Sequence, residues 1–203
     1  YVDSNGNIAD MPHWFRLAQS KLKKEQRKLR NKHGSKKGET KSHNYSKQLQ
    51  KVNNLHEHIA NQRLDYLQKL STHLADTYDV ILIEDLDMKA IANKGFGNGK
   101  ATLDNGWGMF TTMLDYKMAE RCKYLQKVDK WYPSSQTCSV CGCINSETKD
   151  LSIRKWTCPH CGAEHDRDIN AALNIKQEGL RLLNEAGSVS YTHLRAHETR
   201  SNL

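Results

Sequence analysis

The stretch DVILIEDL, from Asp79 to Leu86, decides the fold. Its centre, Val80–Ile83, is a run of four apolar residues, of which three are β-branched. Such a run is typical of a strand buried on both faces, because a half-exposed strand alternates polar and apolar residues. The strand ends in two acids, Glu84 and Asp85. Since helical and strand-like segments alternate around it, the sequence predicts an α/β fold.

Two segments before this strand carry the apolar periodicity of amphipathic helices. Apolar residues recur at steps of three or four over about 13–31 and 43–77, and a Gly/Ser/Lys-rich loop joins the two segments. The second segment predicts a helix about 50 Å long, because each helical residue adds about 1.5 Å. We expect an antiparallel helical hairpin. Near the start of the chain, Asn5-Gly6 predicts a tight turn between two short strands.

The segments after the buried strand continue the alternation. A Gly/Asn/Lys-rich loop over 87–106 has a length often used for lids over active sites. A helix is expected over 107–124, with Cys122 on its apolar side as a core residue. A second strand is expected over 125–131 and a last helix over 167–184.

The positive charge is concentrated in the helical hairpin. The whole chain has a formal net charge of +8, whereas the segment from Arg16 to Lys51 holds 13 Lys/Arg against two acids. A solvated helical face is the ordinary explanation for a basic run, but a cluster this dense favours a surface that binds a polyanion. The candidate nucleic-acid-binding residues are Lys21, Lys23, Lys24, Arg27, Lys28, Arg30, Lys36 and Lys37.

The composition argues against a membrane protein. Mean hydropathy is −0.81. The sequence contains no run of 18 apolar residues and opens with no signal-peptide pattern. We therefore expect a cytoplasmic protein, nucleoid-associated in a prokaryote, without a membrane partner.

Two C-x2-C pairs separated by sixteen residues predict a metal site. Four thiolates at this spacing suit tetrahedral Zn²⁺, and a glycine follows each pair where the chain must turn. An iron–sulfur cluster is the competing interpretation, and the paired spacing disfavours it. Cys143 and His160 are further donors nearby, which we expect to be bystanders, and Trp156 is expected to pack across the ribbon. The predicted zinc ligands are Cys138, Cys141, Cys158 and Cys161.

Two candidate acidic sites flank this cysteine module. Glu84 follows the buried strand, and Asp166 and Asp168 stand at the start of the last helix. Each has an ordinary explanation: a strand-end acid reaching solvent, an N-cap, and a favourable interaction with the helix dipole. Taken together, they suggest carboxylates that converge on divalent metal. Two Mg²⁺ ions held by such acids would suit hydrolysis of a phosphodiester.

Four colinear motifs resemble the TnpB/OrfB proteins of insertion-sequence transposons, which are similar to the nuclease part of type V CRISPR effectors. The resemblance covers about residues 1–187. The motifs are IEDLDMKAI from Ile83, NGWGMFTTMLDYK from Asn105, YPSSQTCSVCG from Tyr132 and WTCPHCGAEHDRDINAALNI from Trp156.

The resemblance implies an RNase-H-like (RuvC) nuclease core with an inserted helical hairpin and a zinc ribbon. It also implies a guide RNA, a DNA target and catalysis by three acids with Mg²⁺. Glu84 matches the second acid and Asp168 the third, in the setting Asp168-Ile-Asn170-Ala-Ala. Asp85 and Asp166 also match recurrent positions, with no role assigned.

The first catalytic aspartate of that pattern has no match in this sequence. It would lie on a strand before Tyr1, and Asp3 and Asp10 are poor substitutes because they lie at and beyond the predicted turn. We expect an N-terminally truncated, incomplete core that does not cleave DNA. The missing strand would leave a sheet edge unpaired, which favours poor solubility.

The end of the chain breaks all pattern. VSYTHLRAHET, within the segment from Ser188, resembles the translation of a common sequencing-adapter end, and a genuine disordered tail is the alternative. We therefore interpret residues 188–203 as an assembly artefact and leave them out of the predicted fold. The expected units are a β-hairpin of the core (1–12), the basic helical hairpin (13–78), the RuvC-like core (79–132), the zinc ribbon (133–165), the last core helix (166–187) and a non-native tail (188–203).

Other functions stay open at this point. A non-catalytic nucleic-acid-binding module would need only the ribbon and the basic hairpin. Carboxyl groups of Glu84 and Asp168 about 4–8 Å apart on one sheet edge would favour the nuclease, whereas opposite faces would favour the binding module. Transposition chemistry carried out by the protein itself is a third interpretation.

Overall fold

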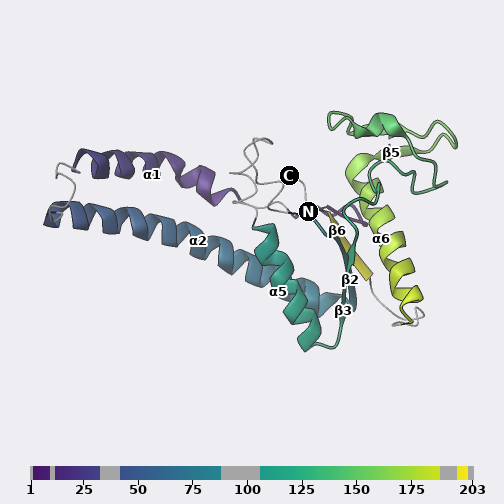
Figure 1. Cartoon of the computed structure of the whole chain (residues 1–203), viewed down its shortest axis with the longest axis horizontal. Coiled ribbons are helices and arrows are strands. Elements are labelled where there is room, and N and C mark those ends of the chain that lie inside the picture. Colours follow the sequence, from purple (N-terminus) through teal and green to yellow (C-terminus); the bar gives the residue numbers. More distant parts are fainter. Residues whose placement is uncertain (1, 10–11, 33–41, 88–105, 188–195, 201–203) are drawn as a thin grey trace.

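A computed structural model describes residues 2–9, 12–32, 42–87 and 106–187, and the backbone of a further strand at 196–200 (Figure 1). Helices and strands alternate along the chain, as an α/β fold requires. The elements are β1 (Val2–Asp3), α1 (Trp14–Asn31), α2 (His43–Thr77), β2 (Val80–Glu84), α5 (Trp107–Glu120), β3 (Tyr124–Val128), η2 (Ser146–Lys149), β4 (Lys155–Thr157), β5 (Glu164–Asp166), α6 (Arg167–Glu185) and β6 (Ala196–Arg200).

The larger sheet has the strand order β1-β6-β2-β3 and is covered on both faces. Strand β2 pairs in parallel with β3 on one side and with β6 on the other. Ile81 and Ile83 pack against α2 and α5, whereas Val80 and Leu82 pack towards α6. Because successive strand residues point to opposite faces, an unbroken apolar run is what this central strand needs. The prediction of a strand buried on both faces is confirmed.

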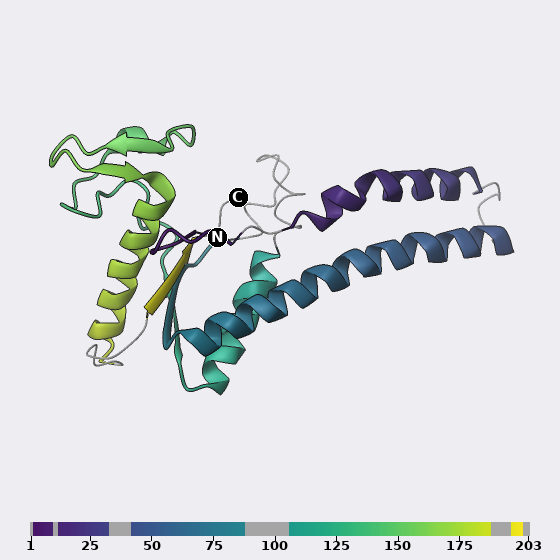
Figure 2. The same ribbon diagram turned by 180° about the vertical axis from the view of Figure 1, so that it is seen from behind.

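Helices α1 and α2 form an arm that projects away from the sheet (Figure 1), and the view from behind shows the same arrangement (Figure 2). The hydroxyl of Ser42 caps α2 by accepting from the backbone N–H of Tyr45 at 3.3 Å. Between the helices, Gln48 Nε2 donates to Glu25 Oε2 at 2.7 Å. At the sheet end, the Trp14 and Tyr66 rings meet edge to face at 5.4 Å between centroids. Both helices lie where the apolar periodicity predicts them.

The turn at Asn5-Gly6 forms as predicted. Gly6 has φ +81°, and its N–H donates to Asp3 O at 3.0 Å. Only a residue without a Cβ adopts this backbone freely, which explains the glycine. The carboxylate of Asp3, which is buried, accepts from the backbone N–H groups of Asn5 and Asn7. Asp3 is therefore engaged in the turn itself.

Helix α5 ends earlier than its apolar pattern predicts. The helix stops at Glu120, and Tyr124 already belongs to β3. Cys122 lies in the reversal between them, with φ +53°, and is exposed. The expectation that Cys122 is a core residue is wrong, because the chain must turn there to bring β3 beside β2. The predicted loop over 87–106 lies almost wholly outside the described residues.

The end of the chain does not stay outside the fold. Ala196–Arg200 forms β6, parallel to β2 and antiparallel to β1, with Ala196 opposite Val80 and Thr199 opposite Asp3. The alternative of a disordered tail is therefore contradicted for Ala196–Arg200, and so is the expectation of an unpaired sheet edge at this place. That residues 188–203 are a non-native tail stays a prediction. Because the backbone groups of β2 are paired on both sides, that edge gives no reason to expect poor solubility.

Candidate metal centres and nucleic-acid interface

Two matching knuckles build the cysteine module. In the first, Cys138 N donates to Cys143 O at 2.8 Å and Gly142 N donates to Cys138 O at 2.9 Å. In the second, Cys158 makes the equivalent bonds with Ala163 and Gly162 at the same distances. Gly142 has φ +75° and Gly162 has φ +74°, so each knuckle closes through a left-handed residue. The antiparallel strands β4 and β5 hold the second knuckle.

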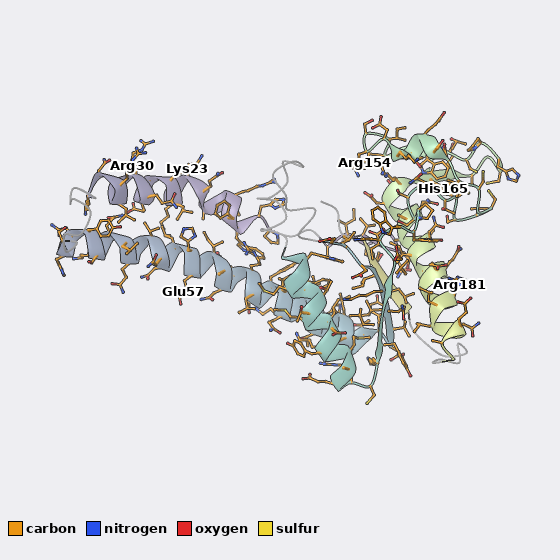
Figure 3. The ribbon with its side chains drawn as sticks, in the orientation of Figure 1. Lys23, Arg30, Glu57, Arg154, His165 and Arg181 are labelled. Atoms are coloured by element: carbon orange, nitrogen blue, oxygen red, sulfur yellow. The ribbon has the colours of Figure 1, made fainter. Side chains whose placement is uncertain are left out.

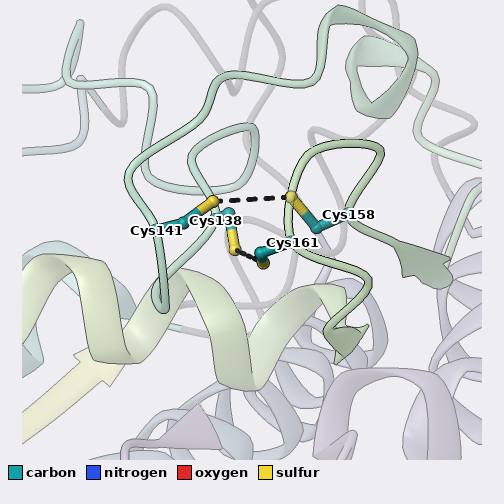
Figure 4. Close-up of side chains that lie close together, drawn as sticks. All are labelled: Cys138, Cys141, Cys158 and Cys161. Carbon is teal, nitrogen blue, oxygen red and sulfur yellow. Dashed lines mark hydrogen bonds between the residues drawn. The ribbon is translucent and has the colours of Figure 1, made fainter.

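The four knuckle cysteines come together (Figure 4). Their Sγ atoms lie within 4.8 Å of one another. The Cys138–Cys161 pair is 3.7 Å apart and the Cys141–Cys158 pair 3.6 Å. Sulfur ligands at about 2.3 Å from a tetrahedral Zn²⁺ would be about 3.8 Å apart, whereas a disulfide would bring them to about 2 Å. The donor set and its spacing therefore fit a structural zinc ion.

The metal-free thiols differ widely in acidity. The backbone N–H groups of Cys161 and His160 lower the pKa of Cys158 to about 6. The backbone N–H of Cys143 acts to lower the pKa of Cys141, but burial and the neighbouring sulfurs together raise that pKa to about 12. Four adjacent thiolates repel one another, so a cation is needed to ionise the whole set.

Trp156 and His165 line the buried side of this cluster. The rings of Trp156 and His165 contact each other at a tilt of 39°, with centroids 4.6 Å apart, and Trp156 packs with Cys138 and Cys158. This confirms the predicted packing of Trp156 across the ribbon. His165 Nε2 lies 3.0 Å from Cys138 Sγ, and burial lowers the pKa of His165. His165 is not among the residues predicted from the sequence, although it follows Cys161 at a spacing within the range that zinc ligands use. Among the described residues, Cys143 and His160 are not part of the metal-binding group.

Glu84 lies at the carboxyl end of β2, half-exposed beside a cavity of about 420 Å³. Its Oε1 accepts a 2.8 Å hydrogen bond from Ser134 Oγ, which is buried. Two further acids, Asp85 and Asp87, line the same cavity, and Lys127 beside them forms an ion pair with Asp85 at 3.8 Å. Oxygen ligands of the type that Mg²⁺ prefers therefore face this space.

Asp168 stands in the first turn of α6, where its Oδ2 lies 3.4 Å from Arg154 Nη1. Asp166 caps the helix by accepting from the backbone N–H groups of Asp168 and Ile169, so its ordinary interpretation as an N-cap is confirmed. The residues that line the cavity beside Glu84 do not include Asp168. Among the described residues, the one group of three or more potential metal ligands is the cysteine set. Convergence of Glu84 and Asp168 on one metal stays a prediction.

The outer side of the arm carries exposed cations. Figure 3 shows Lys23 and Arg30 on the side of α1 that points away from α2. Lys28 pairs with Glu25 at 2.6 Å, and the hydrogen bonds from Lys28 and Gln48 lower the pKa of Glu25. Lys36 and Lys37 lie outside the described residues. The exposed set on α1 is Lys21, Lys23, Lys24, Arg27, Lys28 and Arg30.

A mixed sheet covered by helices on both faces, with a four-cysteine module between two of its elements, defines an α/β protein with a zinc-ribbon type of metal centre. Two family models match the sequence of this chain. Residues 2–95 match the OrfB family, described as "Probable transposase", and residues 107–175 match "Cas12f1-like, TNB domain". The chain is therefore similar to TnpB/OrfB proteins over most of its described length.

Similar proteins carry consistent names. The chain is 40% identical over 68% of its length to a Streptomyces pristinaespiralis protein named "Putative RNA-guided DNA endonuclease", of which it covers 34%. It is 31% identical over 89% of its length to InsQ of Escherichia coli (strain K12), described in the same words, of which it covers 46%. It is 34% identical over 70% of its length to the TnpB-like protein L79 of Acanthamoeba polyphaga mimivirus, of which it covers 28%. The chain thus spans less than half the length of these curated relatives.

One solved structure supports the fold. The cryo-EM structure of a Cas12f1-sgRNA-target DNA complex matches with a TM-score of 0.50 and 18% identity, over 79% of this chain and 41% of that one. At this identity the likeness concerns the fold. Within the described ranges, none of the helices is both long enough and apolar enough to cross a membrane.

Proposed function

We propose that this chain is part of a transposon-associated, RNA-guided, metal-dependent DNA endonuclease with a RuvC-like core. The observation that carries the proposal is the position of Glu84 at the carboxyl end of a buried parallel strand, beside an acid-lined cavity. In open α/β sheets, functional sites form at this edge. The match to the OrfB family model and the names of similar proteins support the reaction class and the two nucleic-acid partners.

In this proposal Glu84 and Asp168 are the two catalytic acids of the chain. Ser134 donates a hydrogen bond to Oε1 of Glu84, and Oε2 of Glu84 would bind the metal. Asp166 caps the first turn of α6, which carries Asp168. Bound Mg²⁺ would supply an activated water and stabilise the leaving oxygen of a phosphodiester. The exposed cations of α1 would contact the guide–target duplex, and a DNA target would place the protein at the nucleoid.

The chain by itself is proposed to be inactive. Among the described residues, no three carboxylates lie as close together as the four cysteines do, and a complete acid triad is therefore not seen. A non-catalytic zinc-ribbon binding module is the second candidate, and the same observation favours it. Metal binding at Glu84 separates the two candidates.

Mn²⁺ binding measured by electron paramagnetic resonance on the zinc-loaded chain tests the proposal. We expect one Mn²⁺ site that Glu84→Gln and Asp168→Asn both weaken at least tenfold. Asp115→Asn, which removes an exposed acid of α5 outside the cavity, should leave it unchanged. If neither Glu84→Gln nor Asp168→Asn weakens Mn²⁺ binding, the result favours the non-catalytic binding module.

A further inference from the structure

Glu84 and the first zinc knuckle belong to one hydrogen-bonded unit. The segment Ser134–Ser139 begins at the serine that holds Glu84 and ends directly after Cys138. Ser134 is 4% exposed and Cys138 is 1% exposed, so the serine and the cysteine are both buried. Only three residues separate a contact to the candidate catalytic acid from a candidate zinc ligand.

Helix α6 holds this segment through two buried asparagines. Asn174 Nδ2 donates to Ser134 O at 2.7 Å and to Thr137 O at 2.6 Å. Asn170 Nδ2 donates to Thr137 O at 2.7 Å, and Asn170 Oδ1 accepts from Ser139 N at 3.0 Å. Both asparagines are 1% exposed. Four residues apart on one helix, they present their amides to the same strip of backbone.

These contacts leave little freedom at either end of the segment. A buried amide that loses its partner keeps its desolvation cost, so each asparagine strongly favours the observed backbone position. The carbonyl oxygen of Ser134 accepts from Asn174, and the backbone N–H of Ser134 donates to Tyr132 O at 2.7 Å. Because both the N–H and the carbonyl of Ser134 are bonded, its hydroxyl donates to Glu84 from a backbone that is held in place.

We propose that Ser134 is a positioning residue for Glu84, and that zinc binding by the ribbon controls it through the Asn170–Asn174 clamp on Ser134–Ser139. Bound zinc would hold Cys138 in place, and with it Thr137 and Ser139, which Asn170 and Asn174 bond to α6. The same asparagine clamp would then hold Ser134 against the Glu84 carboxylate. The catalytic meaning of this coupling rests on the proposed function, but the coupling itself does not. The ordinary alternative is that the asparagines only satisfy buried carbonyls and that Glu84 is indifferent to the ribbon.

Carboxyl ¹³C NMR of the full chain, labelled at glutamate, tests the coupling without any nuclease assay. Glu84→Gln identifies the Glu84 signal, and the signal of Glu57, far away on α2 (Figure 3), reports on the integrity of the arm. We expect Ser134→Ala to shift the Glu84 signal, whereas Ser134→Thr, which keeps the hydroxyl, should largely restore it. Ser135→Ala is the matched control, because among the described residues it is Ser134, not Ser135, that bonds Glu84.

Removal of zinc completes the test. We expect chelation to shift the Glu84 signal of the wild-type chain towards its position in Ser134→Ala, and to leave the signal of Ser134→Ala itself unchanged. Asn174→Ala should act like chelation although Asn174 bonds Ser134 and Thr137 rather than Glu84. If Asn174→Ala also moves the Glu57 signal, it has unfolded, and the chelation experiment decides alone.

Two results would overturn the inference: a Glu84 signal that is the same in wild type and Ser134→Ala, or one that does not move when zinc is removed. A chain that shows the coupling but binds no Mn²⁺ at Glu84 would retain the inference and refute the proposed function. Mn²⁺ binding at Glu84 without the coupling would support the proposed function and refute the inference.

Discussion

Gly179 of α6 packs directly on Leu82 of β2: a Cβ built on this glycine would lie 2.8 Å from Leu82 Cδ2. Leu82 is fully buried, with Val80, Ile175 and Leu183 around it, so its side chain has little room to move. A glycine inside a helix costs about 1 kcal/mol relative to alanine. Here it permits the close approach of α6, the helix that also carries Asp168 and the asparagine clamp.

Gly179→Ala should therefore destabilise the protein despite its better helix propensity. We expect the free energy of unfolding to fall by up to about 2 kcal/mol, because overpacking costs about 1–3 kcal/mol and the better helix propensity returns about 1 kcal/mol. Gly108→Ala in α5 is the matched control: nothing lies within 4 Å of the added Cβ. The control should stabilise by about 0.5 kcal/mol. Urea unfolding measures both, and a stabilised Gly179→Ala would contradict this account of the packing.

Lys117 links α5 to α2 from the interior. It is 6% exposed, and its Nζ donates to Gln68 O, Ser71 Oγ and Thr72 Oγ1 at 2.7–2.8 Å. Burial, assisted by the charge of Arg121, lowers the pKa of Lys117 below its ordinary value of 10.5. The folded chain therefore releases this proton at lower pH than the unfolded chain does. Between the two pKa values the unfolded chain binds more protons, so this lysine makes stability rise with pH.

Lys117→Met should remove that rise while retaining most of the packing, because Met fills the space of the lysine stem. Ser71 Oγ still donates to Leu67 O, and Thr72 Oγ1 to Gln68 O, so the hydroxyls stay bonded. Denaturant unfolding from neutral pH to pH 10.5 would give the difference in slope between the variant and wild type. Equal slopes in the two proteins would show that Lys117 titrates normally in the folded state.

Local patterns predicted much of this molecule, and long-range contacts account for what they missed. Four apolar residues in a row, or two C-x2-C pairs with glycines behind them, each carry their own structural requirement. The sequence of strand β6 carries no such local signal, because Ala196–Arg200 has no apolar alternation; it forms a strand by pairing with β2. The Ser134–Glu84 bond joins residues 50 positions apart, and no spacing rule reaches that far. Helix α5 ended early for the same reason, since the pairing of β3 with β2 overrode its apolar pattern.

Zinc affinity should depend steeply on pH. At neutral pH the pKa values of about 12 for Cys141 and about 6 for Cys158 mean that some thiols are protonated and must release protons to bind the metal. We expect the apparent zinc affinity to fall more than tenfold for each unit of pH below 7. Competition with a chromogenic chelator measures this affinity, and an affinity that does not change with pH would argue against a four-thiolate site.

Cys122, which is exposed and outside the cluster, should react with a thiol reagent whether or not zinc is bound.

The cations of α1 should account for much of the salt dependence of nucleic-acid binding. Lys23 and Arg27 are exposed, four residues apart and therefore on one side of the helix. Lys23→Gln/Arg27→Gln should weaken binding to an RNA–DNA hybrid duplex and reduce the slope of log affinity against log salt by about 0.9 for each phosphate that the variant no longer neutralises. Helix content should stay unchanged, because neither side chain is buried. The matched control is Lys69→Gln/Arg181→Gln, which removes the same charge from side chains paired with Asp65 and with Glu178 and Glu185. If both double variants weaken binding equally, net charge rather than the arm is responsible, and the assignment of this surface fails.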